Sequence, residues 1–546
     1  MFVDSRKVPL DETIHTDLCI VGAGVAGITV AREFSRAPFK TAVIESGGFA
    51  PDKATQSLYW GENVGIPYYD LDTARARFFG GTSHYWHIKL PEKGMGVRLR
   101  PMDPIDFESR EWVPHSGWPY GKSELNPYYE RAQEICRIGP YNYDLGYWAT
   151  PGRQPFKFNA RAGVETTIFQ FGQREVFYKD YKNDLEKSSQ VTVYLNGNVT
   201  EIDTTENAGM VTRLRVDCLE HCRYYVSAKY FILALGGIET PRLLLLSNSA
   251  CKQGLGNQHD LVGRFFMEHP HLWSGAFVPF DLGISNSTNL YQMFRNQGVP
   301  LLAKLTISDE TLRKEKLANW CTSIHPDFRL SHQKYMQHDK KGMSALRALK
   351  NSIGRKPDAG SAADYVADMI SDPGSIGLAA IRKFKGWFQK EFPRHKHIAV
   401  FRLNHMSEQT PNPDSRVMLT EERDALGQRR VKLDWRLNAV DIRTITRAQQ
   451  ILDMQLRQAG LGYLTIETRA DEIPKGIHGG WHHMGTTRMH ADPRQGVVDS
   501  QCRLHGMSNL FIAGASTFPT VGYANPVLTT IAVVLRLSDH IKRLMA

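Results

Sequence analysis

The sequence predicts a mixed α/β fold with more than one domain, and three observations lead to this prediction. The chain has 546 residues, which is more than one small hydrophobic core accommodates. Near the N-terminus, a strand-like run, a glycine-rich turn, a helical run and a second strand-like run follow one another. Further along, short alternating runs separated by turn residues indicate an antiparallel β-meander.

The composition is that of a globular protein, with 42% hydrophobic and 23% charged residues. No apolar run reaches the roughly 18 residues of a transmembrane helix. The N-terminal segment lacks the apolar core of a secretory signal, so we expect a cytoplasmic protein. The seven scattered cysteines are typical of a reducing compartment. Cys218 and Cys222 flank His221, but no second ligand pair follows at zinc-site spacing, and we predict no metal.

The formal net charge is +10, and much of the basic excess lies in one segment, 331–396. Within 334–396 there are 13 Lys and Arg against 6 Asp and Glu. No RNA-binding or helix-turn-helix pattern accompanies them, so we do not expect a nucleic-acid partner. Residues 376–392 interleave aromatic and basic side chains. They suit peripheral contact with an anionic membrane surface, or a lid or surface helix over the active site, which we favour.

The first element is the strand expected at 17–21, and it leads directly into the turn Gly22-Ala23-Gly24-Val25-Ala26-Gly27. A helix is expected over 28–35, and a second strand over 41–44 that ends at Glu45. This order is typical of a Rossmann-like, dinucleotide-binding βαβ unit, and it suits NAD and FAD alike.

Each glycine of the turn has a separate task in such a unit. Gly22 permits the tight turn, Gly24 lets the backbone approach a pyrophosphate, and Gly27 allows close helix–strand packing. The helix N-terminus then presents free N–H groups and partial positive charge to the phosphates. The Glu45 carboxylate is placed to accept hydrogen bonds from a ribose. We therefore predict a nucleotide cofactor on these residues.

The region 191–235 alternates with a period of two and is predicted to form the meander, ending in a buried strand at 230–235. After it, Gly236-Gly237-Ile238-Glu239-Thr240-Pro241 opens an apolar helix. The chain ends in an apolar periodic segment, 527–542, preceded by Asn525-Pro526. Because Asn is a good N-cap and Pro suits the first helical position, we predict a helix that starts there.

Two C-terminal runs contain the most specific pattern in the sequence. The first is Gly480-Trp481-His482-His483-Met484-Gly485-Thr486, and the second is Tyr523-Ala524-Asn525-Pro526. Together with the helix-opening run at 236–241 and Phe79-Gly80-Gly81-Thr82-Ser83-His84-Tyr85-Trp86, they resemble the glucose-methanol-choline (GMC) oxidoreductases, which oxidise alcohols with FAD. The resemblance recurs at intervals along nearly the whole chain and is weakest over 331–396.

The resemblance implies an FAD-binding domain formed by 1–100, 190–270 and 475–546. It implies a substrate domain with an antiparallel sheet and helices, formed by 101–189 and 271–474, with 331–396 as a basic insert. His482 takes the position of the family's catalytic histidine, and Asn525 that of its partner. The residues expected to bind FAD are Gly22, Gly24, Gly27, Glu45, Gly81, Thr82, Ser83, His84, Gly514, Ala515, Asn525 and Pro526. Some relatives link a histidine covalently to the flavin where this chain has Tyr85, so we expect non-covalent FAD, with a link through His84 left open.

Oxidation of an alcohol removes a proton from the hydroxyl and a hydride from the carbon, here to flavin N5. A histidine suits the first task because its unperturbed pKa is about 6.5. We therefore predict that His482 is the base and that Asn525 hydrogen-bonds the same oxygen. A positive helix N-terminus at Pro526 would stabilise negative charge on a reduced flavin. The alternatives are two packed histidines beside Trp481 and an ordinary capped helix.

The sequence thus predicts an FAD-dependent enzyme that oxidises an alcohol group of a sugar, polyol or related compound. The resemblance favours the bacterial sugar- and polyol-oxidising branch, and leaves oxygen, a quinone or a redox protein as the electron acceptor. One alternative is a flavin-containing lyase or other non-redox enzyme on the same fold. The others are a catalytically silent binding protein and an NAD-dependent dehydrogenase.

Overall fold

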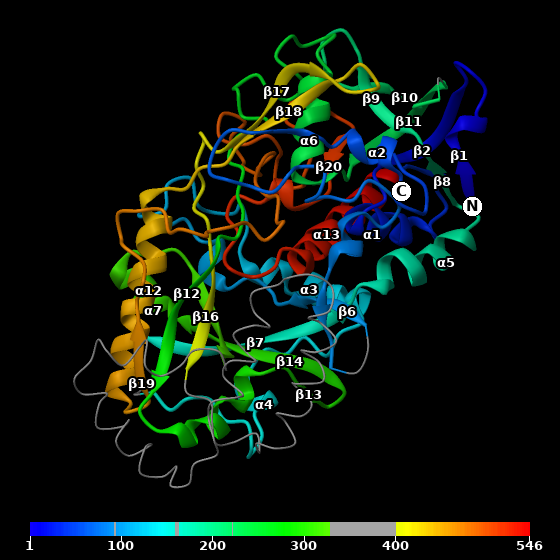
Figure 1. Ribbon diagram of the computed structural model, residues 1–546. Helices are drawn as coiled ribbons and strands as arrows, with labels where there is room; N and C mark the ends of the chain where they lie inside the picture. The colour runs from blue at the N-terminus through cyan, green and yellow to red at the C-terminus, as the bar shows by residue number, and fades with distance from the viewer. Residues whose placement is uncertain (92–93, 159–162, 221, 328–399) are drawn as a thin grey trace, which may run out of the picture.

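The computed structural model describes residues 1–91, 94–158, 163–220, 222–327 and 400–546. The basic insert 331–396 lies outside the described residues, so its predicted roles stay predictions. In Figure 1 the two ends of the chain lie in the same half of the molecule, the one that contains β1, β2, β8 and β11.

A largely parallel sheet forms the centre of this half, in the order β1-β8-β3-β2-β11-β10-β9, with β20 beside β11. Its strands are β1 (Phe2–Asp4), β2 (Thr13–Val21), β3 (Thr41–Ile44), β8 (Val191–Leu195), β9 (Asn198–Thr204), β10 (Val211–Asp217), β11 (Arg223–Leu233) and β20 (Leu510–Ile512). The pairs β8–β3, β3–β2 and β2–β11 are parallel, whereas β9, β10 and β11 are antiparallel. The predicted strands 17–21 and 41–44 are confirmed, and so is the meander over β9, β10 and β11. The first strand of the predicted meander, β8, pairs in parallel with β1 and β3 instead.

Helices cover this sheet because their apolar residues need burial. The helix α13 (Val527–Met545) is buried along most of its length and packs against α1 (Val25–Phe34) and α3 (Lys122–Cys136). The helix α6 (Gly236–Leu246) follows β11, as its glycine-opened sequence predicts. Short helices are α2 (Lys53–Ser57), α4 (Leu145–Trp148), α5 (Tyr181–Glu186) and α7 (Asp309–Glu315).

A second, antiparallel sheet forms the other half, in the order β19-β12-β16-β15-β14-β7-β6-β5, with β13 beside β14. Its strands are β5 (Ile88–Lys89), β6 (Met95–Leu99), β7 (Val164–Gln173), β12 (His271–Pro279), β13 (Phe294–Asn296), β14 (Val299–Ile307), β15 (Trp320–Pro326), β16 (Phe401–Ser407) and β19 (Gly462–Thr465). The long helix α12 (Ala439–Gln458) packs against β19, β16, β15 and β7 of this sheet. A small third sheet joins β4 (Gly61–Asn63), β17 (Arg416–Arg423) and β18 (Arg429–Asp434). The predicted mixed α/β fold with a second, antiparallel sheet is confirmed.

Two segments lie across the domain boundaries that the sequence suggests. The strands β5 and β6 fall within 1–100, yet they pair in the second sheet. The helix α3 falls within 101–189, yet it packs on α13 in the core of the first half. The division into an FAD-binding and a substrate domain stays a prediction, with these segments as connections between the halves.

Cys218 and Cys222 form a disulfide in the turn between β10 and β11. The expectation that the cysteines are reduced is therefore wrong for this pair. The physical reason is the hairpin, because its antiparallel strands bring the two Cα atoms to 5.0 Å, inside the range that a disulfide spans. Cys19, Cys136, Cys251, Cys321 and Cys502 are free thiols.

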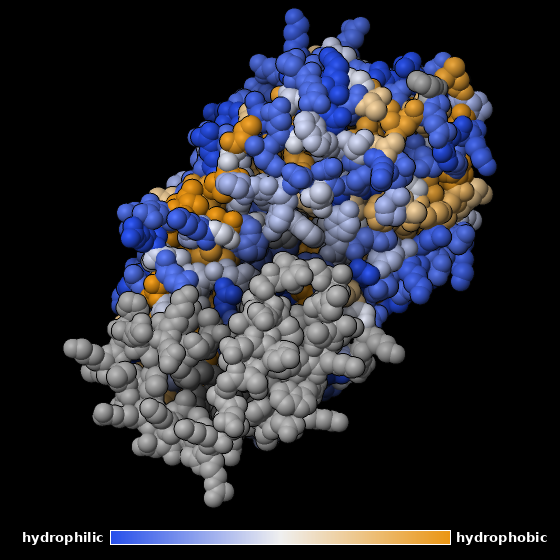
Figure 2. Space-filling model, viewed as in Figure 1, coloured by the Kyte–Doolittle hydropathy of each residue, from blue (hydrophilic) through white to orange (hydrophobic). Residues whose placement is uncertain are grey.

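Among the described residues, no helix combines the length and the apolar character that crossing a membrane requires. The face drawn in Figure 2 is mainly hydrophilic where it is coloured, with apolar side chains gathered in separate patches.

Candidate functional site

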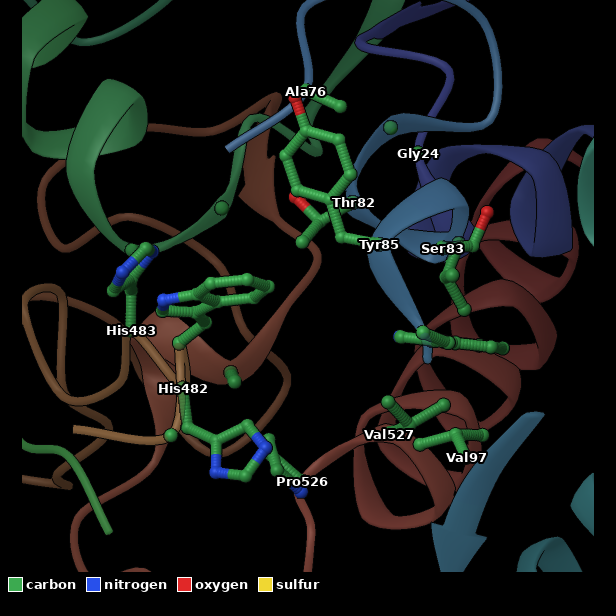
Figure 3. Close-up of a pocket in the computed structure, with 18 of the residues that line it drawn as sticks. Gly24, Ala76, Thr82, Ser83, Tyr85, Val97, His482, His483, Pro526 and Val527 are labelled. Atoms are coloured by element: carbon green, nitrogen blue, oxygen red, sulfur yellow. The ribbon is translucent and has the colours of Figure 1, made fainter. Parts of the chain in front are cut away.

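A cavity of about 670 Å³ lies where the glycine-rich turn, the loop before β5, the second sheet and the start of α13 meet. Most of the predicted site residues line it: Gly22, Gly24, Glu45, Gly81, Thr82, Ser83, Gly514, Ala515, Asn525, Pro526 and His482. In Figure 3, His482 and Pro526 lie at one end of this cavity, across from Gly24, Thr82 and Ser83. Gly27 and His84 are not among the lining residues.

The glycine turn has the shape of a nucleotide cradle. A Cβ at Gly27 would lie 1.9 Å from the Gly22 carbonyl oxygen, so the protein's own packing requires glycine there. A Cβ at Gly24 would meet no protein atom within 4 Å, and Gly24 lines the cavity. The open space at Gly24, at the N-terminus of α1, therefore suits a phosphate-bearing ligand that approaches the backbone.

Glu45 lines the same end of the cavity with its carboxylate largely buried. Oε2 accepts a hydrogen bond from the Ala23 N–H at 2.7 Å, and Oε1 accepts one from the Gly47 N–H at 3.0 Å. These bonds fix the carboxylate beside the glycine turn, where a ribose would lie. Cradle, carboxylate and cavity together fit FAD.

The loop expected over the flavin forms a 3₁₀ turn from Gly81 to Tyr85. Thr82, Ser83 and Tyr85 line the cavity, whereas His84 packs elsewhere. The His84 ring stacks on Tyr178 with centroids 3.8 Å apart, and its Nε2 lies 2.9 Å from the Phe79 carbonyl oxygen. This placement of His84 supports FAD held without a covalent bond.

His482 lies in a chain of three hydrogen-bonded side chains. Its Nε2 is 3.1 Å from Asn525 Nδ2, and its Nδ1 is 2.9 Å from Nδ1 of His269. His269 Nε2 in turn lies 3.3 Å from the backbone oxygen of Val521. The structure thus brings together the two residues that the sequence predicts as catalytic, which lie 43 positions apart, and adds His269 behind them.

The Val521 carbonyl determines the tautomers along this chain. A carbonyl oxygen only accepts, so His269 carries its proton on Nε2 and leaves Nδ1 bare. His482 must then donate from Nδ1, which leaves its own Nε2 bare and facing the Asn525 amide. Burial lowers the pKa of His269 to about 4, so its neutral form is the relevant one. His482 Nε2 consequently has no proton, and its lone pair accepts a hydrogen bond from the Asn525 amide at the end of the cavity.

The pKa of His482 lies well below its usual value of 6.5. Burial is the main cause, and the nearby His269, Arg98 and His483 contribute further. His482 is therefore a neutral base at physiological pH, which is the form that accepts a proton.

Glu268 fixes the backbone that carries His482. Its carboxylate accepts hydrogen bonds from the N–H groups of Gly480 at 2.9 Å and His482 at 3.0 Å, and from the Tyr68 hydroxyl. The residue between those two peptides, Trp481, adopts a φ of 62°, which a bulky side chain rarely takes. The two hydrogen bonds that flank it hold this backbone in place. Burial raises the pKa of Glu268 to about 7 in spite of its donors.

His483 points away from His482 in Figure 3. Its Nε2 lies 2.9 Å from the Tyr68 hydroxyl, and burial lowers its pKa to about 3. The side chain thus belongs to the support formed by Glu268 and Tyr68. This placement suits the expectation that His482 alone of the two is the base.

The start of α13 differs from the expectation in one respect. Its N-cap is Pro526, and the helix begins at Val527. The Asn525 side chain does not cap the helix, because its Nδ2 contacts His482 instead. Asn525 Oδ1 is buried without a hydrogen-bond partner, which leaves it available to a ligand.

Sequence reasoning missed Tyr68, Glu268, His269, His271 and Arg98 as site residues. Glu268, His269 and His271 lie in one short run, Met267-Glu268-His269-Pro270-His271. Its density of ionisable residues beside an apolar strand is a signal that could have marked it. Tyr68 and Arg98 have no such signal, because only the tertiary structure brings Tyr68 to Glu268 and Arg98 to the cavity.

Comparison with known proteins agrees with this geometry. A family model described as GMC oxidoreductase, for the C-terminal part of that family, matches residues 411–533. The fructose dehydrogenase large subunit of Gluconobacter japonicus is 23% identical, over 97% of this chain and 98% of its own. The 2-methyl-1,2-propanediol dehydrogenase of Mycolicibacterium austroafricanum is 22% identical, over 97% and 95%. The paromamine 6'-oxidase of Streptomyces fradiae is 24% identical, over 95% and 90%.

Among solved structures, a formate oxidase superposes with a TM-score of 0.54 and 16% identity, over 98% of this chain and 99% of its own. That likeness shows a shared fold over the whole length. The family match covers the segment that holds both His482 and Asn525, and the full-length relatives are dehydrogenases and oxidases. The C-terminal segment thus matches the GMC oxidoreductase family model, and the full-length relatives indicate an FAD-dependent oxidoreductase that acts on CH–OH groups.

Proposed function

We propose that this enzyme oxidises a CH–OH group of a sugar, polyol or related alcohol, with His482 as the base and Asn525 as its partner. The observation that carries the proposal is the bare Nε2 of His482, which lies 3.1 Å from Asn525 Nδ2 at the end of the cavity. Three relatives are named as enzymes of fructose, of 2-methyl-1,2-propanediol and of paromamine, and these names support a substrate of this class.

Each residue has a defined task in this proposal. His482 Nε2 accepts the hydroxyl proton, and the Asn525 amide hydrogen-bonds the same oxygen and orients it. Bound FAD supplies the acceptor for the hydride that leaves the carbon. Glu268 and His269 hold the imidazole in place and in the required tautomer. Positioned proton transfer of this kind contributes about 10²–10⁴-fold to the rate.

The test is the visible spectrum of the purified protein under anaerobic conditions, before and after addition of a panel of sugars and polyols. Bleaching of the flavin band by one compound supports alcohol oxidation and names the substrate class. A flavin band that persists with every compound contradicts the proposal. Subsequent mixing with oxygen or a quinone analogue then identifies the acceptor from the rate of reoxidation.

Two variants test the assigned roles. His482→Ala should slow flavin reduction by about 10²–10⁴-fold while FAD stays bound. Asn525→Ala should slow it less, because only one hydrogen bond is lost. His483→Ala removes the neighbouring histidine and should cost less than His482→Ala. Equal losses in both histidine variants would assign His482 a structural role.

A further inference from the structure

One face of the second sheet extends the cavity beyond His482. Cross-strand partners point to the same face, and Met406 on β16 pairs with His271 on β12 and with Cys321 on β15. Arg98 on β6 lies against this face, with Nη2 3.9 Å from Met406 Sδ. Arg98, His271 and Asn404 all line the cavity. The wall next to the base is therefore formed by polar and cationic side chains.

Arg98 has no carboxylate partner among the described residues. Among those residues, Arg98 Nη2 contacts the sulfur of Met406, and Arg98 Nε is buried without a hydrogen-bond partner. Burial is the main cause that holds the pKa of Arg98 below its usual range. Its charge also lowers the pKa of His482 and of His271, which places the guanidinium within electrostatic reach of the base.

A second unpaired cation lies behind it. Lys304 on β14 is 1% exposed, and its Nζ contacts Cys321 Sγ at 3.8 Å and lies 5.0 Å from the centre of the Phe169 ring. Burial, followed by the charge of Arg98, lowers the pKa of Lys304 to about 7. No carboxylate of the described residues forms an ion pair with Lys304.

Other buried arginines of this region are paired. Arg100, two residues after Arg98, bonds to Asp103, and Arg110 forms a two-pronged ion pair with Glu408. A buried charge costs free energy unless it is paired, so proteins rarely leave one alone. Arg98, which lines the cavity, and Lys304 behind it have no ion-pair partner among the described residues.

Two further polar groups of this wall lack partners. His271 Nε2 and Asn404 Oδ1 are both buried and unbonded, although their side chains line the cavity. Burial and nearby positive groups lower the pKa of His271, so it is neutral and able to donate from one ring nitrogen. Unbonded buried groups that surround an open space are typical of a ligand site.

We propose that the alcohol substrate carries an anionic group, a carboxylate or a phosphate, which binds to the Arg98 guanidinium while Lys304 adds charge from behind. Arginine suits this task because its planar fork binds carboxylate or phosphate oxygens in pairs. Bound in this way, the anion directs the hydroxyl-bearing carbon toward His482. The substrate class is then a hydroxylated acid or a phosphorylated sugar, and this inference rests on the proposed function.

The experiment compares matched probes that differ only in charge. Anaerobic flavin reduction is measured with gluconate against glucitol, and with glucose 6-phosphate against glucose. We expect one anionic probe to have about a 10- to 100-fold lower apparent dissociation constant than its neutral partner, the effect of one or two charged hydrogen bonds. Preference for gluconate identifies a carboxylate site, and preference for glucose 6-phosphate identifies a phosphate site.

The variants locate the effect. Arg98→Met should raise the dissociation constant of the anionic probe about 10- to 100-fold and that of its neutral partner by less. Arg98→Lys keeps the charge and should restore part of the preference. Arg213→Met, which removes an exposed arginine of β10, is the control and should leave the preference unchanged. The proposal would be overturned if neutral probes bound the wild type as tightly as anionic ones and if Arg98→Met weakened the binding of both kinds of probe equally.

A thermal-shift measurement of the FAD-loaded protein separates this inference from the proposed function. If no probe reduces the flavin, the proposed function fails. The anion site still stands if gluconate or glucose 6-phosphate raises the unfolding temperature of the wild type but not that of Arg98→Met. It falls as well if neither probe shifts the wild type. Lys304→Met gives a second variant should Arg98→Met not fold, and it should weaken binding of the anion in the same direction.

Discussion

At the residue scale, the reactivity of His482 depends on a carbonyl that it does not touch. The Val521 backbone oxygen accepts the Nε2–H of His269, which leaves His269 Nδ1 without a proton. That Nδ1 then accepts the Nδ1–H of His482. A histidine whose second nitrogen bonded to water would exchange tautomers freely. Here the proton is held on the side away from the substrate, and the lone pair faces the cavity.

A substitution of His269 tests this positioning role. His269→Leu removes the acceptor for His482 Nδ1–H and should slow flavin reduction by about 10- to 100-fold, part of the 10²–10⁴-fold that a positioned base contributes. His269→Asn offers an amide oxygen in place of Nδ1 and should recover part of that loss. Stopped-flow reduction kinetics measure both variants. A purely packing role for His269 predicts the opposite order, because Leu fills more of the apolar space than Asn does.

The pH dependence of reduction follows from the direction of the His482 pKa shift. The neutral form is the base, and its pKa is lowered, so the active form persists as pH falls through the usual value of 6.5. At saturating substrate, the rate of flavin reduction should stay constant from pH 8 to below 6.5 and fall only in more acidic solution. Stopped-flow traces across this range test the expectation. A fall centred at or above pH 6.5 would contradict it.

Glu268 requires a control in that experiment, because burial raises its pKa to about 7. Tyr68→Phe removes a donor from this carboxylate and so raises the pKa of Glu268 further. A limb of the pH profile that belongs to Glu268 should move to higher pH in this variant. A limb that belongs to His482 should stay where it is.

At the element scale, two glycines of the glycine-rich turn, Gly27 and Gly24, are needed for different reasons. Gly27 has no room for a Cβ, because the turn at Gly22 lies against the first turn of α1. Gly24 has room on the protein side, so we propose that glycine is needed there for the ligand. The same six-residue motif therefore contains one position fixed by packing and one fixed by binding.

Paired alanine variants distinguish the two positions. Gly27→Ala should lower the unfolding temperature of the FAD-free protein, because a contact of 1.9 Å forces α1 away from the sheet. Gly24→Ala should leave that temperature nearly unchanged and weaken FAD binding instead. Differential scanning fluorimetry without FAD and fluorescence titration with FAD measure the two effects. If Gly24→Ala unfolded the apoprotein as much as Gly27→Ala, the assignment would be wrong.

At the scale of the whole molecule, a buried polar network joins segments far apart in the chain. Arg110 and Glu408 form an ion pair with side chains 1% and 0% exposed, and Glu408 also accepts from the Asn319 N–H at 2.8 Å. Asn319 bonds to Asp106, whose backbone oxygen accepts from the Thr520 hydroxyl. The network thus reaches from the second sheet to the loop that carries Val521.

Breaking this ion pair should be costly for stability. Arg110→Met leaves the Glu408 charge buried without its partner, and we expect a loss of about 3–5 kcal/mol in the free energy of unfolding. Replacing both residues with Met and Gln leaves no unpaired charge and should cost less than the two single changes together. Urea titration followed by fluorescence measures each variant. Additive losses would show that the pair does not act as a unit.

The amino-acid sequence was sufficient to predict the elements whose patterns are local. The βαβ unit, the hairpins of β9, β10 and β11 and the terminal helix follow from hydrophobic periods and turn residues within short windows. The strand at 191–195 was predicted as a strand, but its parallel pairing with β1 and β3 was not. The C-terminal runs were specific enough to indicate the family, since His482 and Asn525 both lie in them. The same local patterns did not predict where β5, β6 and α3 pack. Each of these elements lies in the half of the molecule opposite to the one expected from its position in the chain.

The surroundings of His482 depend on the folded chain. Its tautomer depends on His269 and Val521, its backbone on Glu268 and Tyr68, and the charge of the neighbouring wall on Arg98 and Lys304. These residues come from separate strands and loops, and no short sequence window contains them together. Whether a buried arginine is paired depends on which side chains meet it in space, and sequence spacing does not encode that. The proposed base could therefore be named from the sequence, whereas the proposed anion-binding wall required the fold.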